Sequence, residues 1–289
     1  MKIFLADGRL GNQIFQYVFL KTVQDNNENI IVSGFEDLRE VFEINDIINL
    51  NKKNRLVRIL LFKICKPILN LLTNKKVISS IVIKQETVLN CYKRESTTFD
   101  SIQGILKRIT FIKLGFFQSE KFFDEKYARS LKFKEIYLIK AAEILSGIPK
   151  SCHKIFVHIR SNDYKNHIVY GKSTLLPMNY YKDQIKWFIQ NKKDCFFIFL
   201  GDETKSLSQE FHFIENKMIS INQHFGTDLV LMTQCCSAIL SASSFSWWGS
   251  YMMKERDTVF APKFWLGFRS KIEYQAQGVP SYSKEVEIF

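Results

Sequence analysis

Short apolar runs alternate with longer amphipathic stretches from the first residues of the chain. Residues 2–6 form an apolar, β-favouring run, and residues 7–11 bring two glycines close together. Residues 12–24 are typical of a helix, and a second apolar run follows at residues 29–33. An apolar run, a glycine loop, a helix and another apolar run together predict a β-α-β unit.

A second series of apolar runs occupies the C-terminal half. The predicted strands are residues 155–159, 195–200, 238–240 and 258–261, and helical stretches around residues 180–190 and 206–216 separate them. This alternation predicts a parallel sheet. The less regular middle, residues 37–147, contains helical segments at 56–72 and 119–146. We therefore expect an α/β fold of two domains, residues 1–149 and 150–289, with the boundary near Pro149-Lys150.

Composition narrows the class of partner. The length of 289 residues suits two domains, and the net charge of +12 predicts an anionic partner: nucleic acid, an anionic membrane surface or a small anionic substrate. Six cysteines without a C-x-x-C pair argue against zinc and against a disulfide framework. No secretory signal and no apolar run of about 20 residues is present. We expect a cytoplasmic protein, soluble or peripheral on the inner face of the membrane.

The most informative stretch is the end of the predicted strand at residues 155–159. His158 and Arg160 project from the same face there because side chains alternate along a strand, and Asp163 follows closely. Ligands of α/β proteins bind outside the carboxyl ends of the strands. A guanidinium at that place suits a phosphate, which it can hold with two parallel hydrogen bonds. The alternative is a surface arginine beside a solvated aspartate.

Glycine and serine loops provide two further candidate sites. Gly8 and Gly11 lie in a loop between strand and helix, where amides can face an anion, although the loop matches neither a dinucleotide fingerprint nor a Walker loop. A generic turn would explain these glycines but not the Asn12-Gln13 pair that follows. The run from Ser241 to Gly249 offers hydroxyls at a predicted helix start.

Within the serine run we expect Ser243, Ser244 and Phe245 to meet a ligand. The alternative there is an N-cap serine followed by core aromatics, and core packing is our expectation for Trp247 and Trp248. Asp228, just upstream, can accept both N–H groups of a guanine edge. The alternative for Asp228 is a helix N-cap.

Together, these residues resemble GDP-fucose-dependent fucosyltransferases, most closely the bacterial α-1,2-fucosyltransferases of glycosyltransferase family 11. The resemblance rests on four motifs in family order: Gly8 to Gln13, Gly115 to Glu120, His158 to Tyr164, and Ser243 to Gly249. It implies a GT-B-like architecture of two Rossmann-like domains facing across a cleft. It also implies that residues 1–149 handle the acceptor and residues 150–289 hold GDP-L-fucose.

The implied reaction is an inverting transfer of L-fucose to the 2-hydroxyl of a terminal galactose, without a metal or other cofactor, in surface polysaccharide or O-antigen synthesis. The implied donor contacts are His158 at the nucleotide, Arg160 on the β-phosphate, Asp228 on guanine, and the loops that contain Gly8, Gly11, Ser243, Ser244 and Phe245. The candidate catalytic residues are Arg160, Asn12, near the reacting sugar, and Asp163. For the general base, Asp7, Asp163 or no dedicated base remain open.

One departure from the family pattern concerns the strand end. The family usually has arginine and glycine where this chain has Ser161 and Asn162. If the strand continues to position 161, the side chain there points away from His158 and Arg160. The absence of the second arginine would therefore remove a residue that supports the site, rather than the phosphate contact itself. The substitution also leaves open a sugar-nucleotide binder without activity.

Two further classes stay open beside this one. A fucosyltransferase of another linkage would share the donor motifs, because acceptor choice lies in the variable middle of the chain. A nucleic-acid-binding protein would fit the net charge, but the basic residues are dispersed and no nucleic-acid motif is present, so we expect no nucleic-acid partner.

The segment 56–72 predicts contact with an anionic membrane. Arg58, Lys63, Lys66 and Asn70 recur near the helical period and form a narrow polar stripe on an otherwise apolar helix. The alternative is an ordinary core helix of the acceptor domain, kinked at Pro67.

Overall fold

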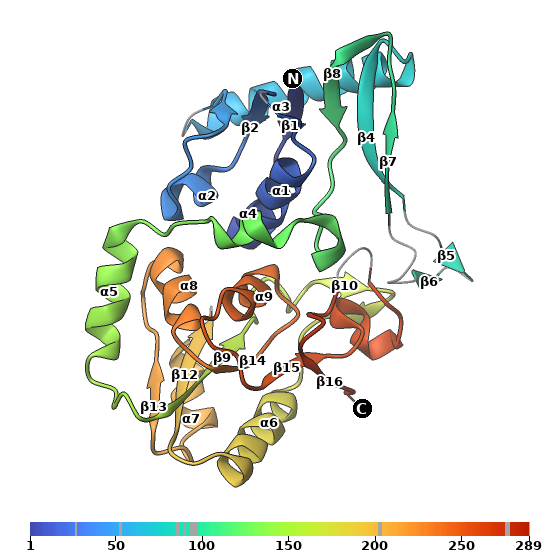
Figure 1. The fold of residues 1–289 in the computed structure, drawn as a ribbon. Helices are drawn as coiled ribbons and strands as arrows, with labels where there is room; N and C mark the ends of the chain where they lie inside the picture. The colour runs from blue at the N-terminus through green and yellow to red at the C-terminus, as the bar shows by residue number, and fades with distance from the viewer. Residues whose placement is uncertain are drawn as a thin grey trace. The chain divides into compact units, whose positions relative to one another are not determined.

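The computed structural model describes residues 1–26, 28–51, 54–84, 87–88, 91–92, 98–201, 204–274 and 278–288. The chain divides into two compact units, Met1–Lys132 (unit 1) and Phe133–Phe289 (unit 2). Each unit has its own six-stranded sheet, as Figure 1 shows. The free thiols among the described residues are Cys65, Cys152, Cys195, Cys235 and Cys236.

Unit 1 is built on a largely parallel sheet. Its strands, in spatial order, are β3 (Ile48–Asn49), β2 (Ile30–Ser33), β1 (Lys2–Leu5), β8 (Leu106–Ile112), β4 (Ile78–Lys84) and β7 (Thr98–Ile102). All neighbours pair in parallel except β4 and β7, which are antiparallel. The remaining elements are α1 (Leu10–Thr22), α2 (Glu36–Val41), α3 (Arg55–Asn74), the pair β5 (Thr87–Val88) and β6 (Cys91–Tyr92), η2 (Glu120–Phe122) and α4 (Glu125–Arg129).

The predicted β-α-β unit at the N-terminus is confirmed. β1 and β2 pair in register from Lys2 to Leu5, and α1 connects them with nearly every side chain on its inner side buried. Phe19 on α1 stacks on Phe117 with ring centroids 3.8 Å apart, and both rings are almost fully buried. This aromatic packing fixes α1, and with it the glycine loop, over the sheet.

Unit 2 is built on an entirely parallel sheet. Its strands, in spatial order, are β13 (Lys217–Ile219), β12 (Cys195–Gly201), β9 (His153–Ile159), β14 (Ser237–Ile239), β15 (Val259–Pro262) and β16 (Lys284–Val286). The other elements are α5 (Glu135–Leu145), β10 (Ile168–Val169), β11 (Lys172–Ser173), α6 (Met178–Asn191), α7 (Thr204–Glu210), α8 (Phe225–Thr233), α9 (Ser244–Tyr251) and η3 (Trp265–Ser270).

The central strands of this sheet are apolar on both faces, as expected of a parallel sheet covered by helices. β9 and β12 pair over seven residues, from His153 with Cys195 to Ile159 with Gly201. Gly201 ends β12 so close to β9 that an added Cβ would lie 2.1 Å from the carbonyl oxygen of Ile159. The ends of these two strands are therefore held in tight contact.

Three expectations about the elements need correction. The chain divides at Lys132–Phe133 rather than near Pro149-Lys150, because α5 packs with α8 in unit 2. The helix expected over residues 119–146 is three short helices, since the chain is extended around Ser119, Phe123 and Lys134. The helix expected over residues 206–216 ends at Glu210, and the antiparallel β4–β7 pair was not anticipated from the sequence.

Candidate functional site

The carboxyl edge of the unit 2 sheet gathers most of the predicted site residues. β13, β12, β9 and β14 are parallel neighbours, so their carboxyl ends lie on one edge. Arg160 follows β9, Ser220 follows β13, and the serine run begins two residues after β14. Adjacent strands are about 4.8 Å apart, which places the ends of β13 and β9 about 10 Å from each other. A nucleotide in an extended conformation is long enough to contact the ends of both strands.

His158 is the last buried polar side chain of β9. Its imidazole is 2% exposed, and its Nδ1 lies 2.6 Å from the hydroxyl of Ser241, at the end of the neighbouring strand β14. The His158 and Phe245 rings are 5.7 Å apart. Ser241 was not among the predicted site residues, although it opens the serine run. It holds the histidine ring in one orientation between the two loops.

Arg160 is held by a two-point ion pair. β9 ends at Ile159, so Arg160 is the first residue of the turn that follows. Its Nε and Nη2 donate to the two carboxylate oxygens of Asp163 at 2.7 and 2.6 Å. The arginine side chain is only 17% exposed, whereas the Asp163 side chain is 47% exposed, so the guanidinium is the more enclosed partner and the aspartate remains in contact with solvent. The pair fixes the guanidinium at the edge of the sheet.

Tyr164 and Ser161 join the Arg160 turn to the rest of the edge. The Tyr164 hydroxyl donates to the carbonyl of Ala242 at 2.7 Å, which links this turn to the serine loop. The buried Ser161 accepts, at its carbonyl, the N–H groups of Tyr164 and Lys165. Tyr164 belongs to the third sequence motif, but its hydrogen bond to Ala242 was not predicted. That contact depends on the pairing of β9 with β14, which cannot be derived from the sequence.

The serine loop is a capped helix start with two outward residues. Ser243 is the N-cap of α9, and its side chain accepts the N–H of Phe245 at 3.3 Å. Trp247 and Trp248 are 2% and 0% exposed, which confirms their predicted place in the core. Ser244 and Phe245 are only half-buried. These two residues present a hydroxyl and an aromatic face where a ligand can meet them.

Asp228 faces the end of β13 and is not a helix cap. The N-cap of α8 is His224, whose ring accepts the N–H of Gly226 at 3.0 Å, so the N-cap interpretation of Asp228 is wrong. The Asp228 carboxylate accepts the hydroxyl of Ser220 at 2.6 Å. Burial raises the pKa of Asp228 to about 6, although the Ser220 hydrogen bond and His224 lower it. Ser220 is a further residue that the sequence did not single out.

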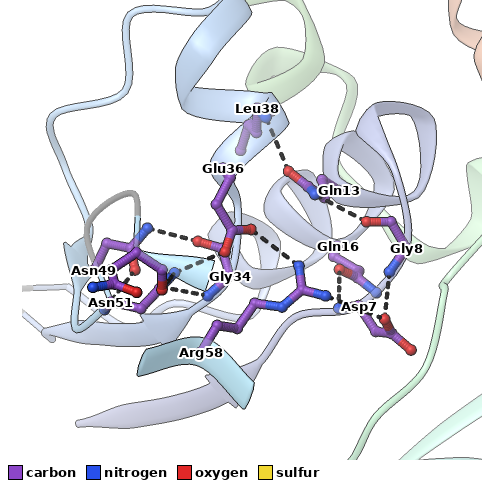
Figure 2. Close-up of polar contacts among 11 residues, drawn as sticks. Asp7, Gly8, Gln13, Gln16, Gly34, Glu36, Leu38, Asn49, Asn51 and Arg58 are labelled. Carbon is purple, nitrogen blue, oxygen red and sulfur yellow. Dashed lines mark hydrogen bonds and ion pairs between the residues drawn. The ribbon is translucent and has the colours of Figure 1, made fainter. Parts of the chain in front are cut away.

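The glycine loop of unit 1 is shaped by Gly8. Its φ is +85°, and an added Cβ would lie 2.5 Å from Nδ2 of Asn12, so this turn requires glycine. Gln13, 1% exposed, donates to the Gly8 carbonyl and accepts the N–H of Leu38, both at 2.9 Å. Figure 2 shows this bridge. Gly11 lies within α1 and is buried, so it serves the helix rather than the open side of the loop.

Asn12 is oriented by a second motif. Gln118, in the segment that follows β8, donates from Nε2 to the Oδ1 of Asn12. Gln118 is 6% exposed, and the Oε1 atom of its amide has no hydrogen-bond partner among the described residues. Gln16 donates to the Gly115 carbonyl at 3.2 Å, beside the same loop. The structure thus brings together the first two motifs, at residues 8–13 and 115–120.

A charged cluster lies next to this loop, and the sequence did not predict it. Arg58 on α3 is 3.1 Å from Glu36 and 4.0 Å from Asp7 (Figure 2). Asn51 donates to Glu36 at 2.7 Å and accepts the Gly34 N–H at 2.8 Å. Arg58 was expected in the polar stripe of residues 56–72. Instead it turns inward, where the charge of the two carboxylates attracts it.

The part of the chain that the structure describes has neither a cluster of metal ligands nor a membrane-spanning helix. Among those residues, no three His, Cys, Asp or Glu side chains come together as a metal site. Within the same residues, no helix is both long and apolar enough to pass through a bilayer.

Comparison of the sequence with known proteins gives matches over almost the whole chain. The family model of glycosyl transferase family 11 matches residues 4–277. An α-1,2-colitosyltransferase from Escherichia coli is 28% identical over 283 residues, which cover 90% of each protein. The O-antigen biosynthesis glycosyltransferase WbnK, also from Escherichia coli, is 24% identical over 310 residues, which cover 91% of this chain and 94% of that protein.

Solved structures with the same fold are fucosyltransferases. NodZ from Bradyrhizobium superposes with a TM-score of 0.51 at 9% identity, over 87% of this chain and 92% of that chain. POFUT1 in complex with GDP-fucose gives a TM-score of 0.56 at 11% identity, over 90% and 97% of the two chains. At such low identity the similarity establishes the fold, which is α/β and GT-B-like, as expected from the sequence.

Proposed function

Because the chain belongs to glycosyl transferase family 11, we propose that it transfers L-fucose, with inversion, from GDP-L-fucose to the 2-hydroxyl of a terminal β-galactoside. The observation that carries this proposal is the carboxyl edge of the unit 2 sheet. There a fixed arginine and the serine loop follow β9 and β14, and the Asp228 carboxylate is hydrogen-bonded to Ser220 at the end of β13, about 10 Å from the end of β9; these groups match a diphosphate at one end and a guanine at the other. Unit 2 is thus the proposed donor-binding unit.

The proposed donor contacts follow from the positions of these groups. Arg160 and the half-buried Ser244 at the start of α9 would face the diphosphate, where N–H and O–H donors suit an anion. His158, held by Ser241, and Phe245 would line the same end. The Asp228 carboxylate would accept the two N–H donors of the guanine edge. Each group sits at the end of a strand or at the start of a helix, where the fold fixes it.

The chemistry requires stabilisation of the leaving group. As the bond to fucose breaks, negative charge develops on the β-phosphate of GDP, and a guanidinium held in advance stabilises that charge more than the ground state. One such donor is worth roughly 3–4 kcal/mol in the transition state. Asp163 has both of its oxygens on Arg160, so we assign it the positioning of that guanidinium.

Unit 1 is the proposed acceptor side. Asn12, whose amide is oriented by Gln118, would lie near the reacting sugar. Asp7 is our candidate for the general base, because its side chain is 46% exposed and its Oδ1 is held by the Gly8 N–H at 2.8 Å. A glycan of a surface polysaccharide or O-antigen is the proposed acceptor, in keeping with the relative named for O-antigen biosynthesis.

Colitose is a second candidate for the transferred sugar. One relative that covers nine-tenths of the chain is named an α-1,2-colitosyltransferase. Colitose differs from L-fucose by one missing hydroxyl, so the same GDP-binding residues would serve either donor. The test offers the protein equal amounts of GDP-L-fucose and GDP-linked colitose with a panel of galactose-terminated glycans, followed by NMR analysis of the linkage. An α-1,2-fucosylated product supports the proposal, whereas exclusive colitose transfer or another linkage overturns it.

Metal removal provides a separate prediction. Because the leaving diphosphate is neutralised by Arg160 and neutral donors, we expect full activity in excess EDTA. The measurement compares initial rates before and after chelation, with added magnesium or manganese as the control. Loss of activity on chelation that either ion restores would contradict the assignment.

A further inference from the structure

Helix α3 exposes an apolar face. Leu56, Leu60, Ile64, Ile68 and Leu71 recur every three or four residues and are between 51% and 75% exposed. We call these five residues the α3 face. The alternative of an ordinary core helix is therefore wrong for this side of α3.

Another side of α3 packs on the fold. Phe62, Leu69 and Leu72 pack against the buried cluster of Leu5, Ile78 and Phe111 in the sheet region of unit 1. Figure 1 shows α3 beside β1, β8 and β4 in that unit. The α3 face therefore points away from the sheet on which the helix rests.

The apolar surface continues beyond the helix. Ile105 and Leu106, at the start of β8, are 80% and 49% exposed. Their N–H groups donate to the carbonyls of Lys76 and Val77, just after the end of α3, at 2.9 and 2.8 Å. Exposed apolar side chains thus extend from the α3 face onto the neighbouring turn. An apolar surface of this extent marks a place of contact.

The stretch of sequence that contains α3 carries charge of one sign. Residues 47–85 contain nine Lys and Arg and no Asp or Glu. Arg58 turns inward, but Lys63, Lys75 and Lys76 are exposed on α3 or at its end. Lys66 is half-buried and lies over the Phe62 ring, 4.4 Å from its centroid.

We propose that the α3 face and its lysines dock the protein on an anionic lipid surface, with α3 lying in the plane of the interface. Apolar side chains would enter the boundary between head groups and acyl chains, and the lysines would meet the anionic head groups. A second copy of the chain is a poorer partner, because it would bring the same positive charge against this one. This inference goes beyond the proposed transfer reaction and does not depend on it.

The test is flotation with vesicles, in the absence of donor and acceptor. The vesicles are phosphatidylcholine alone, or phosphatidylcholine and phosphatidylglycerol in equal parts. We expect the wild-type protein to float with the anionic vesicles at low salt, and to float less at high salt because salt screens the lysines. Two variants, Leu60→Ser/Ile64→Ser/Ile68→Ser and Lys63→Glu/Lys66→Glu/Lys76→Glu, should each lower the floated fraction at least about tenfold.

The matched control changes exposed apolar residues elsewhere. Ile136 and Ile139 on α5 are 67% and 52% exposed, and the variant Ile136→Ser/Ile139→Ser should float like the wild type. Circular dichroism checks that every variant is folded, and sedimentation velocity records the oligomeric state. Three results would overturn the proposal: a wild-type protein that stays unbound, α3 variants that float unchanged, or an oligomer without vesicles that the α3 variants dissociate. The last result would make the α3 face an interface between copies.

Discussion

Replacement of Arg160 by alanine should lower kcat about 100-fold or more, with little change in thermal unfolding. The side chain is proposed to stabilise charge that develops on the leaving diphosphate, and removal of one such donor typically costs this much. Its loss should hardly affect folding, because its partner Asp163 is 47% exposed and becomes hydrated. Initial rates at saturating donor and a thermal melt measure the two effects.

Two companion variants sharpen this prediction. Lys165→Ala removes an exposed positive charge from the same turn and therefore tests whether any loss of positive charge there lowers the rate. We expect nearly normal rates for this variant. Asp163→Asn keeps the size of the partner but weakens the ion pair, and should lower kcat less than Arg160→Ala does, without a change in the shape of the pH profile. A near-normal rate for Arg160→Ala would remove Arg160 from the mechanism.

Replacement of Asp228 by asparagine should weaken GDP binding roughly 100-fold and spare acceptor binding. A carboxylate accepts from both guanine N–H donors, whereas an amide offers one acceptor and a competing NH₂ group, and hydrogen bonds to a charged group are worth about 1.5–3 kcal/mol each. Calorimetry with GDP measures the change. A Ser220→Ala variant, which removes the hydroxyl that Asp228 accepts, should have a smaller effect.

The raised pKa of Asp228 makes the same residue testable by pH. Its pKa is about 6, so the carboxylate form, and with it the affinity for GDP, should increase as the pH rises from 5 to 7. For stability the sign is opposite: burial of the neutral acid favours the folded state below about pH 4, and this contribution is lost as the pH rises through 6. The Asp228→Asn variant should therefore show no such rise in affinity and be at least as stable as the wild type at pH 8. Identical affinity and pH dependence for the two proteins would show that Asp228 does not bind guanine.

The parts of the fold that the sequence predicted correctly are those with a strong local pattern. β1, α1 and β2, as well as β9, β12 and β14, each combine an apolar run of the right length with a clear turn signal. The domain boundary was misplaced because it depends on packing at a distance. Pro149-Lys150 has the composition of a linker, yet α5 before it belongs to unit 2, where the Tyr137 ring stacks 4.9 Å from His224.

The candidate site residues that the sequence singled out are likewise those with a strong local pattern. Arg160, His158 and Ser243 were recognised because they occur in motifs with a chemical meaning. Ser241 and Ser220 were not, since their roles depend on which strand lies beside which, and register is a property of the folded sheet. The ion pairs of Arg58 were not predicted either, because its partners Glu36 and Asp7 come from other elements.

In the proposed donor site, the ion pair of Arg160 with Asp163 would also disfavour the binding of common anions. The Nε and Nη2 donors of Arg160 already meet the Asp163 carboxylate, so chloride, acetate or inorganic phosphate would have to displace that carboxylate without the help of other contacts to bind there. A nucleoside diphosphate arrives with the help of contacts at the base end, and the effective concentration of its phosphates at Arg160 is then high. We therefore expect the proposed donor site to reject abundant small anions and still to admit a nucleotide sugar that is recognised at both of its ends.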